Sequence, residues 1–450
     1  MRSPCRGCVN PCYRPLVRVL GITETCDLGS LYLRLIGEGH EVKVIVSEPL
    51  AQGTMAGLVP RVQALEEGLH WVGSDADAVI VFEAVGFGEL QDQLRCNGFS
   101  VIGGSALGDR LENDRAFALD TLARHGMHIA RTRSFDSPAK GIEDLRNEPR
   151  RCVFKLCASE GRTFVGTARD GSDVAALLRV KPPAEGAAFI LMDHVEGIET
   201  GVGAYFNGER FLRPACMDWE HKRFFAGNMG ELTGEMGTVA TFSGTDKLFE
   251  QTLLRLEPLF REAGHVGWVN LNTVINEDGV WPLEFTCRFG YPGFAVLEPL
   301  QALGWSDLFR SLLDRSSPAF DAHDGFSVCV VLTTPPMPLS RKEVDAPVGL
   351  PILIGDIDRR HLHLGEVGVP DGELVTAGLY GWTAVVTGVG HTVIEGRAAA
   401  YANAAKVHAP NMRYRLDIGD TLIAGDLELL LKWGWLKCTP SIRTASQMVR

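Results

Sequence analysis

The stretch Trp281-Pro-Leu-Glu-Phe-Thr-Cys-Arg-Phe-Gly290 is the most informative in the chain, because it sets one carboxylate in an otherwise apolar strand. A carboxylate on the packed face of a strand is costly to bury unless a cation or hydrogen-bond donors compensate its charge. We therefore expect Glu284 to be a metal ligand or one half of an ion pair, and Arg288 follows four residues later. The run Trp268–Ile275 and the turn Asn276–Gly279 precede this strand, and together they predict a β-hairpin.

Toward the amino terminus, short apolar runs alternate with helical segments. The runs Val17–Leu20, Val42–Val46 and Ala78–Phe82 are separated by segments of helical character such as Leu28–Ile36. This alternation is typical of parallel strands joined by crossover helices. We therefore expect a small doubly wound domain that ends near Gly104.

The rest of the chain predicts one long helix and a series of strands. Asp109–His125 has helical spacing, with Ala116, Leu119 and Ala123 on the packing side and Gly126 as the C-terminal stop. A packing role for this helix is favoured over a catalytic one. Further strands are expected at Cys152–Leu156, Phe189–Met192, Glu199–Phe206, Ser327–Thr333 and Tyr380–Val389, and a helix at Arg397–Val407.

Length and composition limit the classes of partner. A chain of 450 residues exceeds what one hydrophobic core usually supports, so three or four structural units are expected. A formal net charge of -12 without a basic cluster disfavours nucleic acid and anionic membranes, which leaves small molecules as the expected partners. No run approaches the roughly eighteen apolar residues of a membrane span, and the amino terminus lacks a secretory signal's apolar core. We expect a cytoplasmic protein and leave open whether it forms a homo-oligomer.

The eleven cysteines are scattered, which fits reduced thiols better than a disulfide framework. Cys5, Cys8 and Cys12 are spaced closely enough to hold zinc or an iron–sulfur cluster, with Cys26 as a candidate fourth ligand. The Pro, Gly and Arg residues around them favour the alternative, a disordered leader with incidental thiols.

Two more motifs accompany the Glu284 strand. Trp219-Glu-His-Lys-Arg223 holds a compact cationic group, and Gly230-Glu-Leu-Thr-Gly-Glu-Met-Gly-Thr238 is a glycine-rich loop whose backbone N–H groups could face an anion. Together with residues 281–290 they resemble the phosphoribosylamine–glycine ligase family of the ATP-grasp superfamily, and the resemblance covers most of the chain. It implies an α/β protein: an ATP-grasp fold with an N-terminal doubly wound parallel-sheet domain and a small C-terminal α/β domain.

The pattern and the resemblance together predict a division of the chain. The expected segments are a cysteine-containing leader (1–15), the doubly wound domain (16–108), the nucleotide-binding core (109–316), a C-terminal domain (325–436) and a tail (437–450). Arg415-Leu-Asp-Ile-Gly419 resembles the ending of the family's C-terminal domain, and Asp417 beside Arg415 is expected to form a structural ion pair.

The resemblance implies a nucleotide-binding set. Lys155 matches the strand lysine that contacts the nucleotide, and Gly161 and Arg162 lie where the family has its glycine-rich flap. Val195 would offer backbone groups to adenine, and Glu199 would face the ribose hydroxyls. From the residues alone, the alternatives are a surface Lys–Glu pair and an ordinary edge strand with solvated acids.

The resemblance also implies a metal site at Glu284. Magnesium prefers hard oxygen ligands and bridges carboxylates to triphosphate oxygens. Thr286, a poorer ligand, stands on the same face where the family has Asn. Asn270 and Asn272 share a face of the preceding strand, and we hypothesise that one of them replaces the missing oxygen. The predicted metal site is therefore Glu284, Asn272 and Thr286, with Mg²⁺ as the ion and Mn²⁺ as an alternative.

The predicted catalytic group is cationic. His221, Lys222 and Arg223 match the family's Asp-His-Lys-Arg motif near the acyl-phosphate site, and a surface loop with solvated basic residues is the alternative. Arg288 could pair with a carboxylate or phosphate in bidentate geometry.

The amine-substrate side departs from the family. The family's first turn helps to bind a phosphorylated ribose, whereas here Glu24 and Asp27 occupy that turn and would repel a phosphate dianion. Leu232, Glu235 and Tyr291 are further departures. The ATP-binding residues are thus expected to be retained and the amine pocket rebuilt.

The implied activity is that of an ATP-dependent carboxylate–amine ligase. A substrate carboxylate would attack the γ-phosphate of ATP to give an acyl phosphate and ADP, and an amine would then displace phosphate. Glycine ligation to phosphoribosylamine in purine biosynthesis is the first hypothesis. The others are a ligase for a different amino acid or amine in a specialised pathway, and a nucleotide-binding regulator without turnover.

Overall fold

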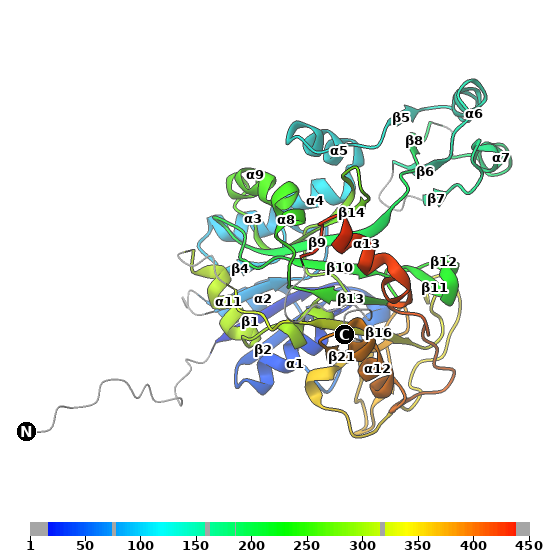
Figure 1. The fold of residues 1–450 in the computed structure, drawn as a ribbon. Coiled ribbons are helices and arrows are strands. Elements are labelled where there is room, and N and C mark those ends of the chain that lie inside the picture. The colour runs from blue at the N-terminus through cyan, green and yellow to red at the C-terminus, as the bar shows by residue number, and fades with distance from the viewer. Residues whose placement is uncertain (1–16, 74–77, 158–162, 185, 316–319, 438–450) are drawn as a thin grey trace, which may run out of the picture.

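The computed structural model describes residues 17–73, 78–157, 163–184, 186–315 and 320–437 (Figure 1). The predicted cysteine leader, most of the predicted tail, and Gly161 and Arg162 lie outside the described residues. Within the ranges described, no helix combines the length and the apolar character needed to cross a membrane.

The N-terminal part is a four-stranded parallel sheet with the strand order β2-β1-β3-β4. Its elements are β1 (Arg18–Thr23), α1 (Gly29–Gly37), β2 (Glu41–Val46), α2 (Leu65–Val72), β3 (Val79–Phe82), α3 (Gly88–Cys96) and β4 (Val101–Ile102). All four residues of β3 are buried, as expected for a strand covered on both faces. The doubly wound domain predicted from the apolar runs is confirmed.

An eight-stranded sheet with the order β15-β14-β9-β10-β13-β16-β21-β18 forms the centre of the molecule. Its strands are β9 (Ile198–Asn207), β10 (Cys216–Glu220), β13 (Gly237–Thr241), β14 (Val266–Ile275), β15 (Val280–Thr286), β16 (Phe326–Thr333), β18 (Leu362–Leu364) and β21 (Trp382–Gly390). β14 and β15 form the predicted hairpin, in which the Asn276 N–H donates to the Gly279 carbonyl at 3.1 Å. The sheet continues from β13 into β16, so the C-terminal segment extends the sheet of the core.

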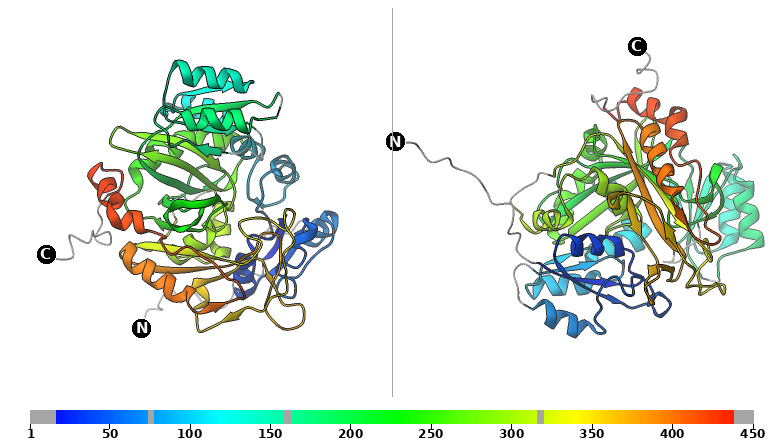
Figure 2. Two further views of the ribbon diagram at one scale, coloured as in Figure 1. Left: turned by 90° about the vertical axis from the view of Figure 1, so that its right-hand side faces the viewer. Right: turned by 90° about the horizontal axis from the view of Figure 1, so that it is seen from below.

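A smaller antiparallel sheet of four strands, in the order β5-β8-β6-β7, projects from the rest of the molecule (Figures 1 and 2). Its elements are β5 (Thr132–Phe135), α6 (Pro138–Asn147), β6 (Cys152–Leu156), β7 (Thr163–Val165), α7 (Ser172–Val180) and β8 (Phe189–Asp193). Strand β6 occupies the residues predicted for it, with Lys155 near its end.

The helix predicted over Asp109–His125 is wrong in its continuity. The chain forms α4 (Ala106–Asn113) and α5 (Arg115–Arg124), which are divided at Asp114. Asp114 Oδ1 accepts a hydrogen bond from the Phe117 N–H at 3.0 Å and so caps α5. A short acidic side chain competes with helical backbone hydrogen bonding in this way, which explains why the helix restarts here.

The predicted packing face of this helix is wrong at two of its three positions. Leu119 packs against a small apolar cluster, but Ala116 and Ala123 are exposed, whereas Ala118 and Leu122 are buried in the core. Gly126 ends the segment as predicted, with a φ of +76° that few other residues adopt.

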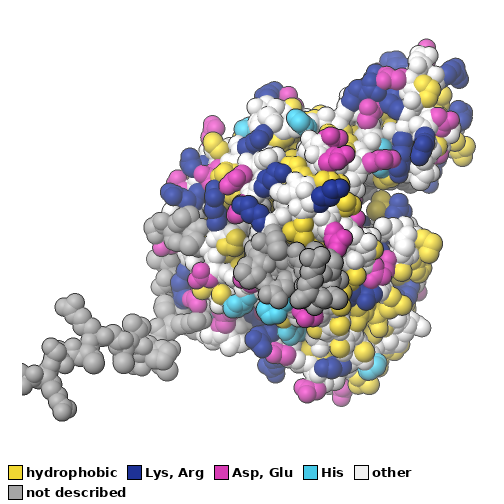
Figure 3. All heavy atoms as spheres, viewed as in Figure 1, with side chains coloured by type: hydrophobic (Ala, Val, Ile, Leu, Met, Phe, Trp, Pro, Cys, Tyr) yellow, Lys and Arg dark blue, Asp and Glu magenta, His cyan; other side chains and the backbone are white. Residues whose placement is uncertain are grey.

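The remaining elements cover the large sheet or connect its strands. The helices are α8 (Asp246–Gln251), α9 (Glu257–Glu262), α10 (Gly293–Leu297), α11 (Trp305–Leu313), α12 (Val393–Ala404) and α13 (Leu427–Lys432). The short strands pair as β11 (Arg223–Phe225) with β12 (Met229–Leu232), β17 (Leu353–Ile354) with β22 (Val407–His408), and β19 (Val367–Gly368) with β20 (Val375–Thr376). Basic and acidic side chains are interspersed over the face that Figure 3 displays.

The two faces of the large sheet have different surroundings. Along β14, Val269 and Leu271 belong to one apolar core, whereas Trp268 packs in another core together with the N-terminal sheet. By strand alternation, Asn270 and Asn272 share the face of Trp268. The polar side chains of the candidate site therefore lie on the face that looks toward the N-terminal domain.

Candidate active site

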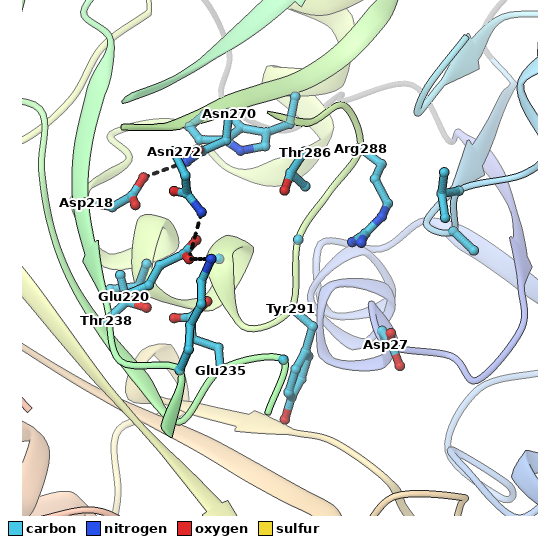
Figure 4. A pocket seen from close by; sticks show the side chains of 18 of the residues that line it. Asp27, Asp218, Glu220, Glu235, Thr238, Asn270, Asn272, Thr286, Arg288 and Tyr291 are labelled. Atoms are coloured by element: carbon cyan, nitrogen blue, oxygen red, sulfur yellow. Dashed lines mark hydrogen bonds and ion pairs between the residues drawn. The ribbon is translucent and has the colours of Figure 1, made fainter. Parts of the chain in front are cut away.

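A cavity of about 360 Å³ lies on this polar face (Figure 4). The strands and the loops after them line it with Asp218, Glu220, Lys222, Glu235, Thr238, Asn270, Asn272, Glu284 and Thr286. The opposite side and the rim hold Glu24, Thr25, Asp27, Arg288, Tyr291, Tyr380 and Trp382. Trp219 and Phe285, which alternate with the polar residues, pack in the apolar core on the other face of the sheet.

Lys222 joins the carboxylates at one end of the cavity. Its Nζ lies 2.8 Å from Glu284 Oε1, 3.1 Å from Glu220 Oε2 and 3.9 Å from Glu199 Oε1. Burial alone would lower the pKa of Lys222, but these three carboxylates raise it well above its ordinary value. Lys222 is therefore a fixed positive charge in this site.

Glu284 is both a cavity residue and half of an ion pair. The Lys222 ammonium lowers the pKa of Glu284 to about 2 against the opposing effect of burial, and Lys155 adds to this lowering. Arg115 Nη2 lies 3.6 Å from Glu284 Oε2. An ionised carboxylate that faces a cavity could still ligate a metal, so the two alternatives for Glu284 are compatible.

The hairpin register places Asn272 opposite Glu284 and Asn270 opposite Thr286. Asn272 Nδ2 donates to Glu220 Oε2 at 3.0 Å, and Asn270 Nδ2 donates to Asp218 Oδ2 at 2.6 Å (Figure 4). The predicted metal residues are thus brought together at one end of the cavity. Their roles stay predictions.

Two buried acids in this cavity were not among the predicted site residues. Asp218 alternates with Glu220 on β10, and Gly201 on β9 makes room for it, since a Cβ on that glycine would overlap the carboxylate. Burial, followed by the charge of Glu220, raises the pKa of Asp218 to about 8. The same two causes raise the pKa of Glu235 well above its ordinary value. The alternation Asp-Trp-Glu at 218–220 could have indicated Asp218, because it places Asp218 on the same face of the strand as Glu220.

Lys155 approaches this cluster from the small sheet. Its side chain is buried, and burial together with the charge of Arg115 lowers its pKa to about 8. Glu284, Lys222 and Glu199 lie close enough to affect its ionisation as well. Arg115 lies at the start of α5, and it was not among the predicted site residues because the sequence pattern favours a packing role for that helix.

The predicted adenine linker lies between the two sheets. Val195 and Trp281 pack against a small apolar cluster of Ala130, Ile190 and Met192. Glu199 lies near the start of β9. Its side chain is 55% exposed, and its Oε1 is close to the Lys222 ammonium. An apolar patch beside a solvent-facing carboxylate is compatible with a purine and a ribose, and these two roles stay predictions.

The predicted catalytic residues separate in space. Lys222 and Arg288 line the cavity, whereas His221 and Arg223 are not among its lining residues. His221 is buried and its Nε2 accepts a hydrogen bond from the Gly419 N–H at 3.2 Å. Burial and, after it, Arg415 lower the pKa of His221 to about 4, so this imidazole is neutral near pH 7.

Arg223 belongs to the β11–β12 hairpin, which the C-terminal segment holds in place. Its Nη1 donates to the Gly230 carbonyl at 2.7 Å. The fully buried Arg415 donates to the Arg223 carbonyl at 2.9 Å and pairs with Asp417 at 2.8 Å. The expected structural ion pair between Arg415 and Asp417 is confirmed.

Arg288 faces the N-terminal side of the cavity. Its Nε lies 3.6 Å from Glu112 Oε2, and Asp27 is near enough for Arg288 to lower its pKa against the larger effect of burial, which raises it. Glu24 and Asp27 line the cavity, as their place in the first turn predicts.

The described structure has the ATP-grasp fold. Residues 113–294 match the family model described as phosphoribosylglycinamide synthetase, ATP-grasp (A) domain. This matched segment contains the small sheet, the hairpin and all the residues proposed here to contact ATP. The predicted fold class is therefore confirmed.

Within this class, the chain is related to phosphoribosylamine–glycine ligases, as its motifs indicated. It is 26% identical over 367 residues to the phosphoribosylamine–glycine ligase of Neisseria meningitidis serogroup B, covering 76% of this chain and 85% of that protein. The corresponding ligase of Escherichia coli O6:H1 is 28% identical over 349 residues, which cover 73% and 79% of the two chains.

Solved structures agree on the fold. The crystal structure of phosphoribosylamine–glycine ligase from Thermotoga maritima superimposes with a TM-score of 0.69 at 22% identity, covering 89% of this chain and 100% of that one. N5-carboxyaminoimidazole synthetase from Staphylococcus aureus, complexed with ADP, gives a TM-score of 0.55 at 13% identity, covering 86% and 97% of the two chains.

Proposed function

We propose that this protein is an ATP-dependent carboxylate–amine ligase of the phosphoribosylamine–glycine ligase type, which forms an amide and releases ADP. One observation carries the proposal: Lys222, Arg115 and Lys155 converge on Glu284 at one end of the cavity in an ATP-grasp fold. Several fixed cations around one ionised carboxylate suit a triphosphate with its metal ion, because both charges then find partners.

The residues present fit a divalent metal ion. Glu284 and Glu220 offer carboxylate oxygens on the cavity wall, and Asn272, hydrogen-bonded to Glu220, offers an amide oxygen. Mg²⁺ is commonly held by one or two carboxylates and by substrate phosphate oxygens, and Mn²⁺ accepts the same donors. When bound, the ion would neutralise charge on the transferring phosphoryl group.

The remaining steps are assigned to residues of this chain. Lys222 and Arg288 both line the cavity, so we assign to them the carboxylate substrate and the acyl phosphate that it forms with the γ-phosphate. Lys155 would contact the nucleotide from the small sheet, and Val195 and Glu199 would border its adenine and ribose. His221 and Arg223 would act indirectly, by fixing the hairpin and the loop that flank Lys222.

A coupled assay of ADP release tests the proposal. The full chain is given MgATP, glycine and phosphoribosylamine, then the same mixture with other amines in place of phosphoribosylamine. We expect amine-dependent ADP release that EDTA abolishes and that Glu284→Ala lowers by about 100-fold or more, since a group that holds transition-state charge is removed. Glu262→Ala, on an exposed face of α9, is the matched control.

The outcomes separate the candidate functions. ADP release that depends on phosphoribosylamine selects the first hypothesis. Release with another amine selects the second, which Glu24 and Asp27 in the cavity wall favour. Tight ATP binding without release for any amine would contradict the ligase and leave the nucleotide-binding regulator.

The expected place of action is the cytoplasm. Seven cysteines in the described ranges are free thiols, and five of these are buried. Reduced thiols suit the reducing conditions of that compartment. We propose that the protein acts in the cytoplasm, in purine biosynthesis or in a pathway with related chemistry.

A further inference from the structure

We propose that the amine substrate of this site is an organic cation, a diamine or a basic amino acid, whose second cationic group is held by Asp218 and Glu235 beside the aromatic side chains of Tyr291, Tyr380 and Trp382. The inference rests on the proposed ligase function and names the substrate class for the same cavity. One amine of such a molecule would react while the other stays protonated and anchors it.

The cavity holds more acidic than basic side chains. Its lining includes the acids Glu24, Asp27, Asp218, Glu220, Glu235 and Glu284, and the bases Lys222 and Arg288. Lys222 is paired with Glu220 and Glu284, and Arg288 with Glu112. In the described part of the chain, the other four acids have no ion-pair partner within 4 Å. A positively charged ligand would supply the missing partner.

Two of these acids present unsatisfied oxygens. Glu235 is 6% exposed and Asp218 is 5% exposed. Glu235 Oε1 and Asp218 Oδ1 are buried, and neither has a hydrogen-bond partner among the residues that the structure describes. Buried polar atoms nearly always have a partner, so unpaired oxygens in a cavity wall point to N–H donors on a ligand.

An aromatic wall stands in the same cavity. The rings of Tyr291 and Trp382 stack with their centroids 4.8 Å apart, and those of Tyr380 and Trp382 are 4.9 Å apart. All three side chains line the cavity. Aromatic faces attract ammonium and guanidinium groups through their quadrupole, and they also pack against an alkyl stem.

The aromatic wall is fixed in advance by a buried acid. Glu366 is 3% exposed, and its carboxylate accepts hydrogen bonds from the backbone N–H groups of Leu379, Tyr380, Gly381 and Trp382. This anchor orders the loop before any ligand arrives. A preordered wall loses little conformational freedom on binding, which favours a small ligand.

The same features act against a phosphorylated acceptor. A phosphate dianion in the cavity would face Glu24 and Asp27 on one side and Asp218 and Glu235 on the other. Glu24 and Asp27 would repel the dianion when ionised, and among the described lining residues both cations, Lys222 and Arg288, already have carboxylate partners. The cavity therefore selects by charge as well as by shape.

Ligand titrations on the full chain in the presence of MgADP test the inference. The probes are 1,5-diaminopentane, L-lysine and L-arginine as cations, ribose 5-phosphate as the phosphorylated comparison, and glycine as the small zwitterion. We expect at least one cation to bind about tenfold or more tightly than ribose 5-phosphate, and added salt to weaken it. Trp382 should report binding through a change in tryptophan fluorescence that Trp382→Phe removes.

Variants locate the binding site. Glu235→Gln keeps the size of the side chain and removes its charge, and it should weaken the cationic probes by about tenfold or more. Glu250→Gln, on the exposed side of α8, is the matched control and should bind them as the natural chain does. Circular dichroism and thermal unfolding show whether each variant folds. If Glu235→Gln does not fold, Asp218→Asn replaces it in the titrations.

Each result decides one of the two claims. Ribose 5-phosphate binding more tightly than every cation, or cation binding that Glu235→Gln leaves unchanged, would overturn the inference. If Mg²⁺ alone, without nucleotide, displaced the cationic probes, Asp218 and Glu235 would be assigned to a metal ion, and the inference would also be overturned. Failure of the natural chain to bind MgATP in a separate titration would instead overturn the ligase function.

Discussion

Lys222 and Glu284 form an ion pair of 2.8 Å between the loop after β10 and the edge strand β15. The pair joins two sequence motifs that are far apart in the chain. It also leaves Glu284 ionised over the whole physiological pH range, because Lys222 lowers its pKa to about 2. The site is therefore charged and ordered before a nucleotide binds.

Replacing the ammonium tests this arrangement. Lys222→Met keeps most of the side-chain volume but leaves Glu284 and Glu220 without their cation. We expect ADP release to fall about 100-fold or more, and the free energy of unfolding to fall by about 1–3 kcal/mol, since the carboxylates are only partly screened by solvent. Urea unfolding and the ADP assay measure the two effects. Lys181→Met, at an exposed position after α7, is the control, and unchanged turnover in Lys222→Met would remove Lys222 from the site.

The buried acids predict an unusual pH dependence of stability. Burial is the largest cause that raises the pKa of Asp218 and of Glu83 to about 8, from ordinary values of 3.8 and 4.5. Between about pH 4 and pH 8 these two groups bind more protons in the folded chain than in the unfolded chain, so their contribution to stability falls as the pH rises. His221, whose pKa is lowered from 6.5 to about 4, contributes the opposite slope between these two values. Each group contributes a slope of at most roughly 1.4 kcal/mol per pH unit.

Urea unfolding at pH 5, 6.5 and 8 measures this slope. Asp218→Asn removes one of the two groups and should flatten the dependence, whereas Asp371→Asn, at an exposed loop position, should leave it unchanged. A slope of the same size in Asp218→Asn would show that Asp218 is already ionised in the folded chain. The measurement is made without ligand, because a bound cation would favour the ionised form.

The carboxylate of Glu366 predicts a stability and a binding effect at once. Glu366→Ala leaves four backbone N–H groups without this acceptor, two of them buried and two partly buried, and we expect a loss of about 2–4 kcal/mol in the free energy of unfolding. Glu366→Gln keeps one acceptor oxygen and should lose less. Hydrogen exchange at residues 379–382 should become faster in both variants, most in Glu366→Ala. Unchanged exchange there would mean that the loop is held by other contacts.

Local patterns in the sequence predicted the strands and the hairpin. Strand β6 begins at Cys152 and ends at Leu156 as expected, because a short apolar run between polar turns has few other solutions. The turn Asn276–Gly279 and the face shared by Asn270 and Asn272 follow from the same local rules. The break at Asp114 was missed because one capping side chain outweighed an otherwise helical spacing.

The shape of the cavity could not be predicted in this way. Asp218 meets Asn270, and Tyr291 meets Trp382, only because the order of the strands and the loops brings distant segments together. The sequence around one residue of such a pair does not indicate its partner. Arg115 was missed for a related reason, since its partner Glu284 lies on a strand far along the chain. The acidic lining of the cavity follows from these long-range contacts and could not be predicted from local patterns.

Arg415 anchors the β11–β12 hairpin. Arg415 is fully buried and makes a two-pronged ion pair with Asp417, and it also donates to the Arg223 carbonyl and to Asn228 Oδ1. Lysine cannot make this fork, so Arg415→Lys should loosen the hairpin while keeping the charge. We expect Arg415→Ala to lower the free energy of unfolding by about 3–5 kcal/mol, because it leaves Asp417 without its partner, and Arg415→Lys to lower it by less.

Hydrogen exchange over residues 223–232 separates a local effect from a global one. In Arg415→Lys, these amides should exchange faster while those of β14 keep their rates, because the hydrogen bonds of Arg415 go to Asp417, Arg223 and Asn228. Arg360→Lys is the matched control, since Arg360 pairs with Asp358 two residues away in the same way, but on the surface, where little change is expected. Equal effects of the two Arg→Lys variants would show that burial of Arg415 does not strengthen its hold on the hairpin. ADP release by Arg415→Lys should fall as the hairpin loosens, because the hairpin and its loop position Lys222. Normal turnover in a variant with a loosened hairpin would show that the hairpin does not position Lys222.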